Sequence, residues 1–373
     1  SLRGIRSCAS SLRNTPSGFR LEARNPLDAW GTGRDFVGIF RDCTKALHDD
    51  PDTAVMVHFA DIRTGYYIHD GYLEAHTALA GQTSKPLVVA TNYTQLRHDE
   101  IVAKFAAIGV PVLDGTVASL MAIRHMLHHR DFLARRPSTP PQVPAGVRDR
   151  WRKRLSEPRA LDESESLVLF AEYGIATVKS RLADNADEAA RSASALDYPV
   201  ALKSARPGLL HKTDADGVRL NIGDELGLRA AYADLAARLG PRVLVSKMAG
   251  KGVEVMLGAS IDPQFGPVVV IGAGGTLVEM LASVTHELAP FDVGAARRAL
   301  ERLAPLFKIL WGGRGRPPSD LDSLSMLIAG FSAMAADLAD LVAEIDANPI
   351  IAGPAGAIAV DAIVVPRAAK EKT

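Results

Sequence analysis

The sequence predicts an α/β protein in two parts, a parallel-sheet unit followed by a larger unit of mixed strands and helices. Three observations predict this class. Short apolar strands alternate with helices before residue 136, four prolines gather between residues 137 and 144, and strand pairs with glycine turns follow. A chain of 373 residues is long enough for two or three domains, each with its own hydrophobic core.

The composition argues against several kinds of partner. The 43 basic and 43 acidic residues give a net charge of zero, so nothing favours nucleic acid. No apolar run approaches the roughly 20 residues that span a bilayer. The only cysteines, Cys8 and Cys43, are too few for a disulfide framework and lack metal-ligand spacing, which is typical of a reducing compartment. We therefore expect a cytoplasmic protein without nucleic-acid or membrane partners.

Residues 1–23 are interpreted as a leader or as the start of a fragment. The chain begins at Ser1 without a methionine and has no acidic residue up to Arg20. That composition is typical of a transit peptide, but a fragment boundary explains it equally well and is the interpretation we favour.

Residues 24–136 form the first predicted unit. We expect strands at 54–59, 86–90 and 110–113, and helices near 36–47 and at 72–80, 101–108 and 116–134. This alternation favours a parallel sheet covered on both faces. The segment after the first strand lacks G-x-G-x-x-G, so the unit has no phosphate fingerprint.

One helix of this unit carries three histidines on one face, His125, His128 and His129. Three imidazoles can bind zinc, but the neighbouring Arg124 and Arg130 would repel a cation. The pattern therefore favours a solvated helix face over a metal site.

Residues 137–157 are predicted to be a proline-rich linker that ends in the start of a solvated basic helix, 148–154. Residues 158–368 form the second predicted unit. Its expected helices are 161–173, 186–196, 226–239 and 321–341. Its expected strands are 177–180, 200–202, 218–222, 243–248, 252–258, 265–275, 344–351 and 357–361.

The stretch Pro199–Asn221 is the centre of the functional hypothesis. Lys203 follows directly on an apolar strand, where an ammonium group is expensive to desolvate without an anionic partner. A loop containing His211 then leads to a return strand. The stretch is either a phosphate-binding hairpin or an ordinary hairpin in which Lys203 pairs with a protein carboxylate, and the residues alone favour neither.

Two further groups of residues lie beyond this hairpin. Glycines at 272, 274 and 275 follow an apolar strand and offer backbone N–H groups to a phosphate. Asp346, Asn348 and Asp361 lie on two adjacent strands, and carboxylate and amide oxygens suit Mg²⁺. The strand Leu244–Met248 is a candidate hinge for an adenine ring. Each feature alone is common in loops and turns, but together they predict a nucleotide site.

These residues resemble the ATP-grasp part of the ADP-forming acyl-CoA synthetases, relatives of succinyl-CoA synthetase. The resemblance is carried by six sequence words, which are Tyr198–Lys203, His211–Val218, Gly252–Glu254, Asp262–Pro267, Gly272–Gly275 with Val278-Glu279, and Asp346–Pro349 with Val360-Asp361. Residues 24–136 are similar to the flavodoxin-like ligase subdomain that precedes the ATP-grasp domain in fused members. The implied fold is a flavodoxin-like domain followed by an ATP-grasp domain of two subdomains.

The resemblance implies a role for each matching residue. His211 would be a phosphohistidine that exchanges a phosphoryl group with the nucleotide. Residues that would bind ATP are Lys203, Lys247, Met248, Glu254, Gly274 and Gly275. Asn348 and Asp361 would hold Mg²⁺, with Asp346 nearby. The implied reaction converts a carboxylic acid, ATP and CoA into acyl-CoA, ADP and phosphate.

The chain also departs from the family. It shows neither a CoA-binding domain nor the loop that carries the primary phosphohistidine of the family, so we expect a partner domain or subunit for the acid and CoA, and an oligomer. Ser283 and Glu287 stand where Asp and Arg are usual, and Lys247 where Glu or Gln is common. The alternatives are a regulatory ATP-binding module of an acetyltransferase relative and a non-catalytic subunit.

Overall fold

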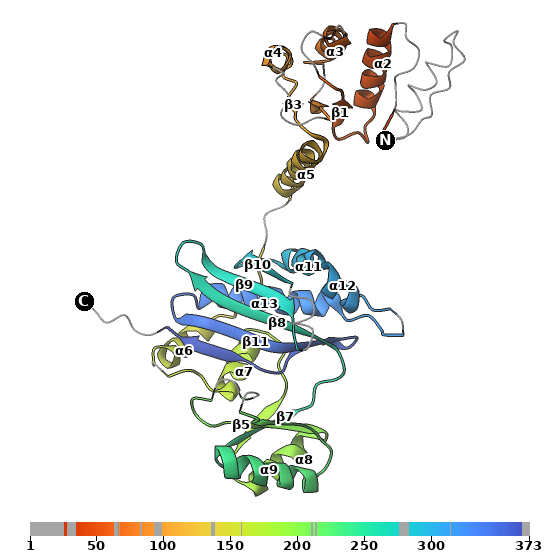
Figure 1. Ribbon diagram of the computed structural model, residues 1–373. Coiled ribbons are helices and arrows are strands. Elements are labelled where there is room, and N and C mark those ends of the chain that lie inside the picture. Colours follow the sequence, from red (N-terminus) through yellow and green to blue (C-terminus); the bar gives the residue numbers. More distant parts are fainter. Residues whose placement is uncertain are drawn as a thin grey trace, which may run out of the picture. The chain divides into compact units, whose positions relative to one another are not determined.

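The computed structural model describes residues 26–27, 35–62, 66, 68–82, 84–92, 99–135, 139–157, 159–209, 212, 215–275, 283–313 and 315–367 (Figure 1). The chain forms two compact units, residues 1–136 and 137–373. Each has hydrophobic clusters of its own. No helix in the described ranges is both long enough and apolar enough to cross a membrane.

The first unit contains the expected parallel sheet, in the order β1 (Met56–Phe59), β2 (Leu87–Ala90), β3 (Val112–Leu113). Every residue of the central strand β2 is buried, as its unbroken apolar run predicts. The helices are α2 (Phe36–Asp49), α3 (Ile68–Thr77), α4 (Asp99–Ala107) and α5 (Thr116–Leu133). The four helices and three strands predicted here are confirmed, with ends that differ by a few residues.

Two side-chain predictions in the first unit had different outcomes. The histidines of α5 are exposed, as expected for a solvated face. Within the described ranges, no group of three or more His, Cys, Asp or Glu side chains is placed to hold a metal ion. Cys43 of α2 is disulfide-bonded in this structure, which the cysteine count did not predict.

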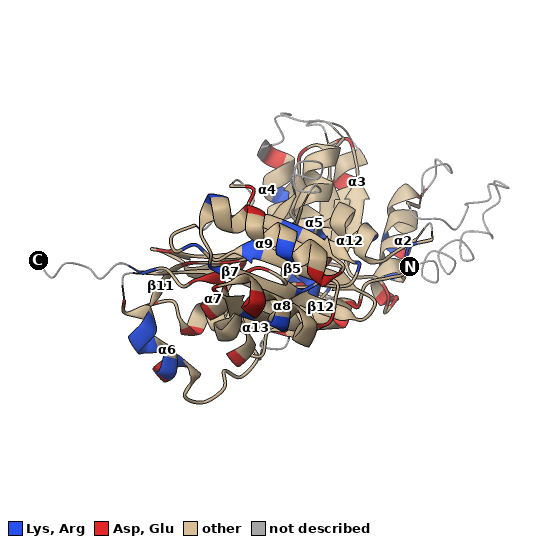
Figure 2. Cartoon of the chain, turned by 90° about the horizontal axis from the view of Figure 1, so that it is seen from below, with Lys and Arg blue, Asp and Glu red and all other residues tan. Residues whose placement is uncertain are grey.

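The second unit begins with helix α6 (Val147–Leu155), whose basic residues are blue in the ribbon of Figure 2. The basic run is helical, as predicted, and the apolar ends of the helix, Val147 and Leu155, are buried in the core of this unit. Helix α7 (Glu163–Glu172) follows. Asp162 and Glu165 form a reciprocal capping box at its N-terminus, which fixes the point where the helix starts.

An antiparallel sheet with the strand order β4-β7-β5-β6 comes next. The strands are β4 (Ser180–Ala183), β5 (Val200–Ser204), β6 (Val218–Ile222) and β7 (Val243–Lys247). Helices α8 (Ala186–Leu196) and α9 (Glu225–Leu239) pack against each other and against this sheet. The strand predicted at 177–180 is wrong by three residues, because Thr177 instead makes an isolated bridge to Ala359 of the second sheet.

The second sheet has the order β10-β9-β8-β11-β12, and β13 pairs with β11. Its strands are β8 (Val253–Asp262), β9 (Gly266–Ala273), β10 (Val284–Leu288), β11 (Val342–Gly353), β12 (Gly356–Ala359) and β13 (Ile363–Pro366). Helices α11 (Val293–Arg302), α12 (Ala304–Leu310) and α13 (Leu321–Asp337) complete the unit (Figure 1). The sequence prediction missed β10, α11, α12 and β13.

Candidate functional site

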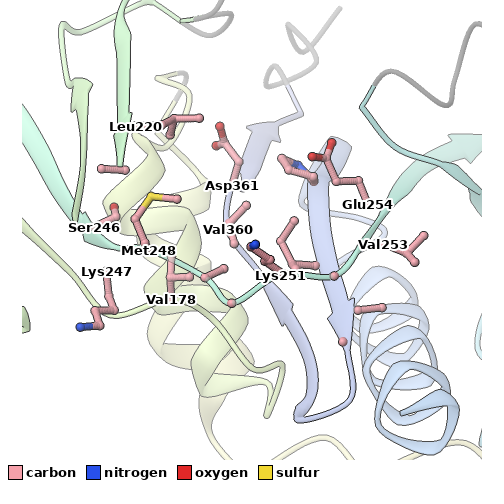
Figure 3. A pocket seen from close by; sticks show the side chains of 18 of the residues that line it. Val178, Leu220, Ser246, Lys247, Met248, Lys251, Val253, Glu254, Val360 and Asp361 are labelled. Atoms are coloured by element: carbon pink, nitrogen blue, oxygen red, sulfur yellow. The ribbon is translucent and has the colours of Figure 1, made fainter. Parts of the chain in front are cut away.

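The two antiparallel sheets of the second unit border a cavity of about 920 Å³. Lys203, Leu220 and Ser246 line it from the first sheet, and Glu254, Asn348 and Asp361 line it from the second or from the segments that follow its strands. Figure 3 labels Leu220, Ser246, Glu254 and Asp361 among them. A site between two sheets is built from residues that are distant in sequence. The fold therefore brings together Lys203 and Asn348, which are 145 positions apart in the sequence.

Lys203 belongs to a buried network of ions at the end of β5. Its Nζ donates to Oε1 of Glu163 at 2.5 Å and to the carbonyl oxygen of Val360 at 2.8 Å. It also lies 3.5 Å from Oδ2 of Asp361. Burial alone lowers the pKa of Lys203, but the two carboxylates outweigh it and the pKa is raised. The partner that the sequence left open is therefore a pair of protein carboxylates.

A second ammonium group enters the same network. Nζ of Lys212 lies 2.9 Å from Oε2 of Glu163 and 4.0 Å from Oδ1 of Asp361. The side chains of Lys212 and Glu163 are both less than a tenth exposed. Two lysines thus share two carboxylates, and the four formal charges cancel.

Asn348 reaches the cavity through an irregularity in β11. The pairing of β11 with β8 shifts register between Ala347 and Ile350, because Pro349 has no N–H group for the ladder. The backbone N–H of Val360 donates to the carbonyl oxygen of Pro349 at 3.1 Å. Asp361 directly follows Val360, so this bond places Asp361 close to the part of β11 that contains Asn348. The two predicted metal ligands therefore line the same cavity.

The carboxyl group of Asp361 has a raised pKa. Burial and the neighbouring Glu163 carboxylate raise its pKa, against the opposing effect of Lys203 and Lys212. A divalent cation would stabilise the ionised form, so the donor set of Asp361 and Asn348 fits Mg²⁺ that also binds substrate phosphates. Asp346 does not line the cavity and lies across from Gly258 of β8.

The glycines after β9 lie close to Glu254. The N–H of Gly274 donates to the carbonyl oxygen of Glu254 at 2.8 Å. Gly275 has a φ of +56°, and a Cβ atom there would overlap the Glu254 carboxylate. In Figure 3 the carboxylates of Glu254 and Asp361 lie at the same end of the cavity. The sequence thus needs glycine at position 275 for both conformation and space.

The predicted hinge, at the end of β7, also borders the cavity. Met248 lines it together with the apolar side chains of Val178 and Leu220. The ammonium group of Lys247 points away in Figure 3 and donates to the carbonyl oxygen of Asp197 at 2.6 Å. Its aliphatic part therefore lines the cavity, while its charge is directed outside.

Of the predicted residues, six line the cavity, and these are Lys203, Lys247, Met248, Glu254, Asn348 and Asp361. Gly274, Gly275 and Asp346 do not line it. His211 lies outside the described residues, so its position is not described here.

Sequence reasoning missed Glu163, Lys212 and Ser246. The buried hydroxyl of Ser246 lines the cavity and has no hydrogen-bond partner among the described residues. Glu163 stands in the first turn of a helix, where acidic residues are common, so its pattern indicated only a helix start. Glu287, one of the departures, forms an ion pair with Arg302 of α11.

Comparison with known proteins assigns the chain to a family. An ATP-grasp domain family matches residues 153–365. The β subunit of the ADP-forming acetate–CoA ligase I of Pyrococcus furiosus is 34% identical over 226 residues, which are 58% of this chain and 97% of that subunit. The chain belongs to the ADP-forming acyl-CoA synthetase family. The family resemblance predicted from the sequence words is confirmed, and the family consists of ligases that form a carbon–sulfur bond.

A longer match and a solved structure extend this assignment. A trans-feruloyl-CoA synthase from an unknown prokaryotic organism is 33% identical over 353 residues, 89% of this chain but only 47% of that synthase. A structure of the dinucleotide forming acetyl-coenzyme A synthetase 1 of Ca. Korarchaeum cryptofilum covers 59% of this chain and all of its own. It is 32% identical with a TM-score of 0.51, and it contains coenzyme A and Mg-AMPPCP, with a phosphohistidine segment pointing towards the nucleotide site. Nucleotide and Mg²⁺ are therefore used in this family.

Proposed function

We propose that this chain binds MgATP and carries out the phosphoryl-transfer step of an ADP-forming acyl-CoA synthetase. The support is the cavity that Lys203, Asn348 and Asp361 line together. A solved structure of a relative contains Mg-AMPPCP. Mg²⁺ bound at Asp361 and Asn348 supplies positive charge to the phosphates. Lys203 orients them, and the apolar side chains near Met248 receive the base.

His211 is proposed as the nucleophile. A nitrogen of the neutral imidazole forms a bond to the γ-phosphorus, and the bond from that phosphorus to the bridging oxygen breaks. ADP leaves with the electron pair, and the imidazole loses its N–H proton to solvent. In the forward ligase reaction the phosphoryl group then passes to the acid, whose acyl group is transferred to CoA.

The acid and CoA are proposed to bind on another polypeptide or domain. The chain spans nearly all of a relative that is named as a β subunit, but about half of the trans-feruloyl-CoA synthase. A complex of this chain with a CoA-binding partner is therefore part of the proposal, as is location in the cytoplasm.

The test is phosphorylation by ATP labelled in the γ position. With Mg²⁺ and the partner polypeptide, we expect an acid-labile, base-stable phosphate on this chain. His211→Ala should abolish it, because the attacking nitrogen is gone, whereas His125→Ala on the exposed face of α5 should keep it. Chain that binds ATP but stays unlabelled beside its partner would contradict the proposal and would favour a regulatory ATP-binding module.

A further inference from the structure

Helix α5 of the first unit carries large apolar side chains that nothing in the described structure covers. Val117, Leu120, Met121 and Phe132 are 72%, 50%, 52% and 60% exposed. No described helix or strand packs against α5 as extensively as α2 packs against α3, and Figure 1 shows α5 extending away from the three-stranded sheet. Single exposed apolar residues are ordinary, but several on one helix indicate a surface that binds another protein.

The spacing of these side chains places them on one side of the helix. Residues that are three, four or seven positions apart in a helix share a face. The set with this spacing, which we call the outward face of α5, is Val117, Leu120, Met121, Arg124, His128 and Phe132. The buried residues of α5, Ser119 and Ile123, lie on the other side of the helix. The outward face is about 22 Å long, at 1.5 Å per residue.

The outward face is cationic as well as apolar. Arg124 lies near its middle, and no acidic residue belongs to it. The guanidinium group of Arg135 lies over the Phe132 ring, 5.7 Å from its centre, and adds positive charge at one end. A partner that fits must therefore offer an apolar surface flanked by carboxylates.

This distribution of charge disfavours a second copy of the chain as the occupant. In a two-fold pair the same surface meets itself, so a residue near the middle of the face meets its own counterpart. Two outward faces packed in this way would bring the two Arg124 side chains together, and like charges oppose such a contact. The face is therefore suited to a different polypeptide.

The relatives indicate which part of the enzyme accompanies the first unit. The β subunit from Pyrococcus furiosus is matched over 226 residues, which are 97% of it, so that subunit has room for the second unit, 137–373, but not for both units. The trans-feruloyl-CoA synthase is matched over 353 residues, more than the second unit alone contains, and about half of that synthase lies outside the match. A counterpart of the first unit thus occurs in a chain that carries further domains.

We infer that the outward face of α5 is the surface on which this chain binds the CoA-binding part of the enzyme. The contact on the partner is an apolar surface with carboxylates around it. The inference rests on the proposed function, which assigns the acid and CoA to another polypeptide or domain. It gives the two units different tasks, because the first holds the partner and the second binds MgATP.

The test measures the affinity of this chain for the CoA-binding polypeptide of the same organism with which it forms acyl-CoA. Met121→Ser should weaken that complex by about tenfold or more, because a large apolar side chain is lost from the interface. Met126→Ser is the matched control. It changes the same residue type on the same helix, about 140° away around the axis, and should alter the affinity by less than about twofold. Affinity for MgATP should be the same in all three proteins.

Variants of Arg124 test the charge of the face. Arg124→Glu should weaken the complex by about tenfold or more, whereas Arg124→Lys keeps the charge and should weaken it by less than about threefold. Added salt should weaken the wild-type complex more than the Arg124→Glu complex, because salt screens the attraction that the variant lacks. Equal salt dependence in the two would contradict a partner with carboxylates.

The remaining outcomes separate the occupants. Equal affinity of wild-type and Met121→Ser chains for the partner would overturn the inference, as would equal losses in Met121→Ser and Met126→Ser. A wild-type dimer in sedimentation that Met121→Ser dissociates would assign the face to a second copy instead. Wild-type chain that binds MgATP but not the CoA-binding polypeptide would overturn this inference and leave nucleotide binding intact, whereas chain that binds no MgATP would overturn the proposed function itself.

Discussion

Lys203 and Glu163 form the centre of the ion network at this site, and only the first of them was predicted from the sequence. Lys203 could be predicted because an ammonium group directly after an apolar strand requires an anion. Glu163 could not be assigned as that anion, because it lies 40 positions away and its local pattern is that of a helix start. Long-range pairing of charges is decided by the tertiary fold, and one sequence holds no record of it.

Lys203 and Lys247 should differ in their effects on nucleotide binding. Lys203→Met removes an ammonium group beside the phosphates, so we expect ATP affinity to fall by about tenfold or more. Lys247→Met removes a charge that is directed to the carbonyl oxygen of Asp197, so the expected change is less than about threefold. Calorimetric titration with MgATP measures both. Equal losses in the two variants would place the ammonium group of Lys247 inside the cavity after all.

At the scale of elements, helices were easier to predict than edge strands. Helix α8 was predicted with the observed ends, because Asn185 caps its first turn and its apolar face is regular. Strand β10 was missed, since its residues Val284–Leu288 alternate between intermediate and exposed positions and lack an apolar run. Pro349 is a local signal that β11 pairs irregularly. The orientation of Asn348 also depends on the neighbouring strand β8, which the local sequence does not indicate.

The glycine turn after β9 provides a test at this scale. Gly275→Ala places a Cβ atom against the Glu254 carboxylate at a positive φ, so we expect destabilisation of about 1–3 kcal/mol and weaker ATP binding. Gly223→Ala is the control, because a Cβ atom there meets no neighbouring atom within 4 Å. Denaturant unfolding and MgATP titration measure the two effects. A Gly275→Ala variant as stable as the control would show that the turn relaxes without cost.

For the whole molecule, the sequence predicted the α/β class and that the strands of the first sheet are parallel. It predicted neither the number of strands in the last sheet nor the disulfide bond at Cys43. Strand number depends on which segments find partners in space, as β13 does beside β11. The two compact units are also expected to respond differently to pH.

Two histidines should make the first unit sensitive to acid. Nδ1 of His58 lies 2.9 Å from Nε2 of His76. Burial, with a smaller effect of neighbouring histidines, lowers the pKa of His58 to about 3 and that of His76 to about 4, against 6.5 when exposed. The unfolded chain therefore binds more protons below pH 6.5, and stability is lost as the pH falls from 6.5 towards 4, by about 1.4 kcal/mol per pH unit for each histidine.

Hydrogen exchange of the whole chain between pH 7.5 and pH 4.5, corrected for the intrinsic pH dependence of exchange, measures this loss. Protection of β1 and α3 should fall more than protection of β5 and β8. The variant His58→Phe should reduce the difference between the units, because only one titrating group remains in the pair. Equal loss of protection in both units would contradict the prediction.

The ion network also has a mechanical consequence. Glu163 lies in helix α7, Lys203 in β5, Lys212 between β5 and β6, and Asp361 between β12 and β13. The network therefore links the two walls of the cavity to each other. A ligand that draws Asp361 away from the lysines would break these ion pairs, and at the same time its own phosphates would bridge the two walls. The ion pairs would then hold the cleft rigid before binding, and the bound nucleotide would hold it rigid afterwards. Release of ADP would therefore be coupled to re-forming these ion pairs.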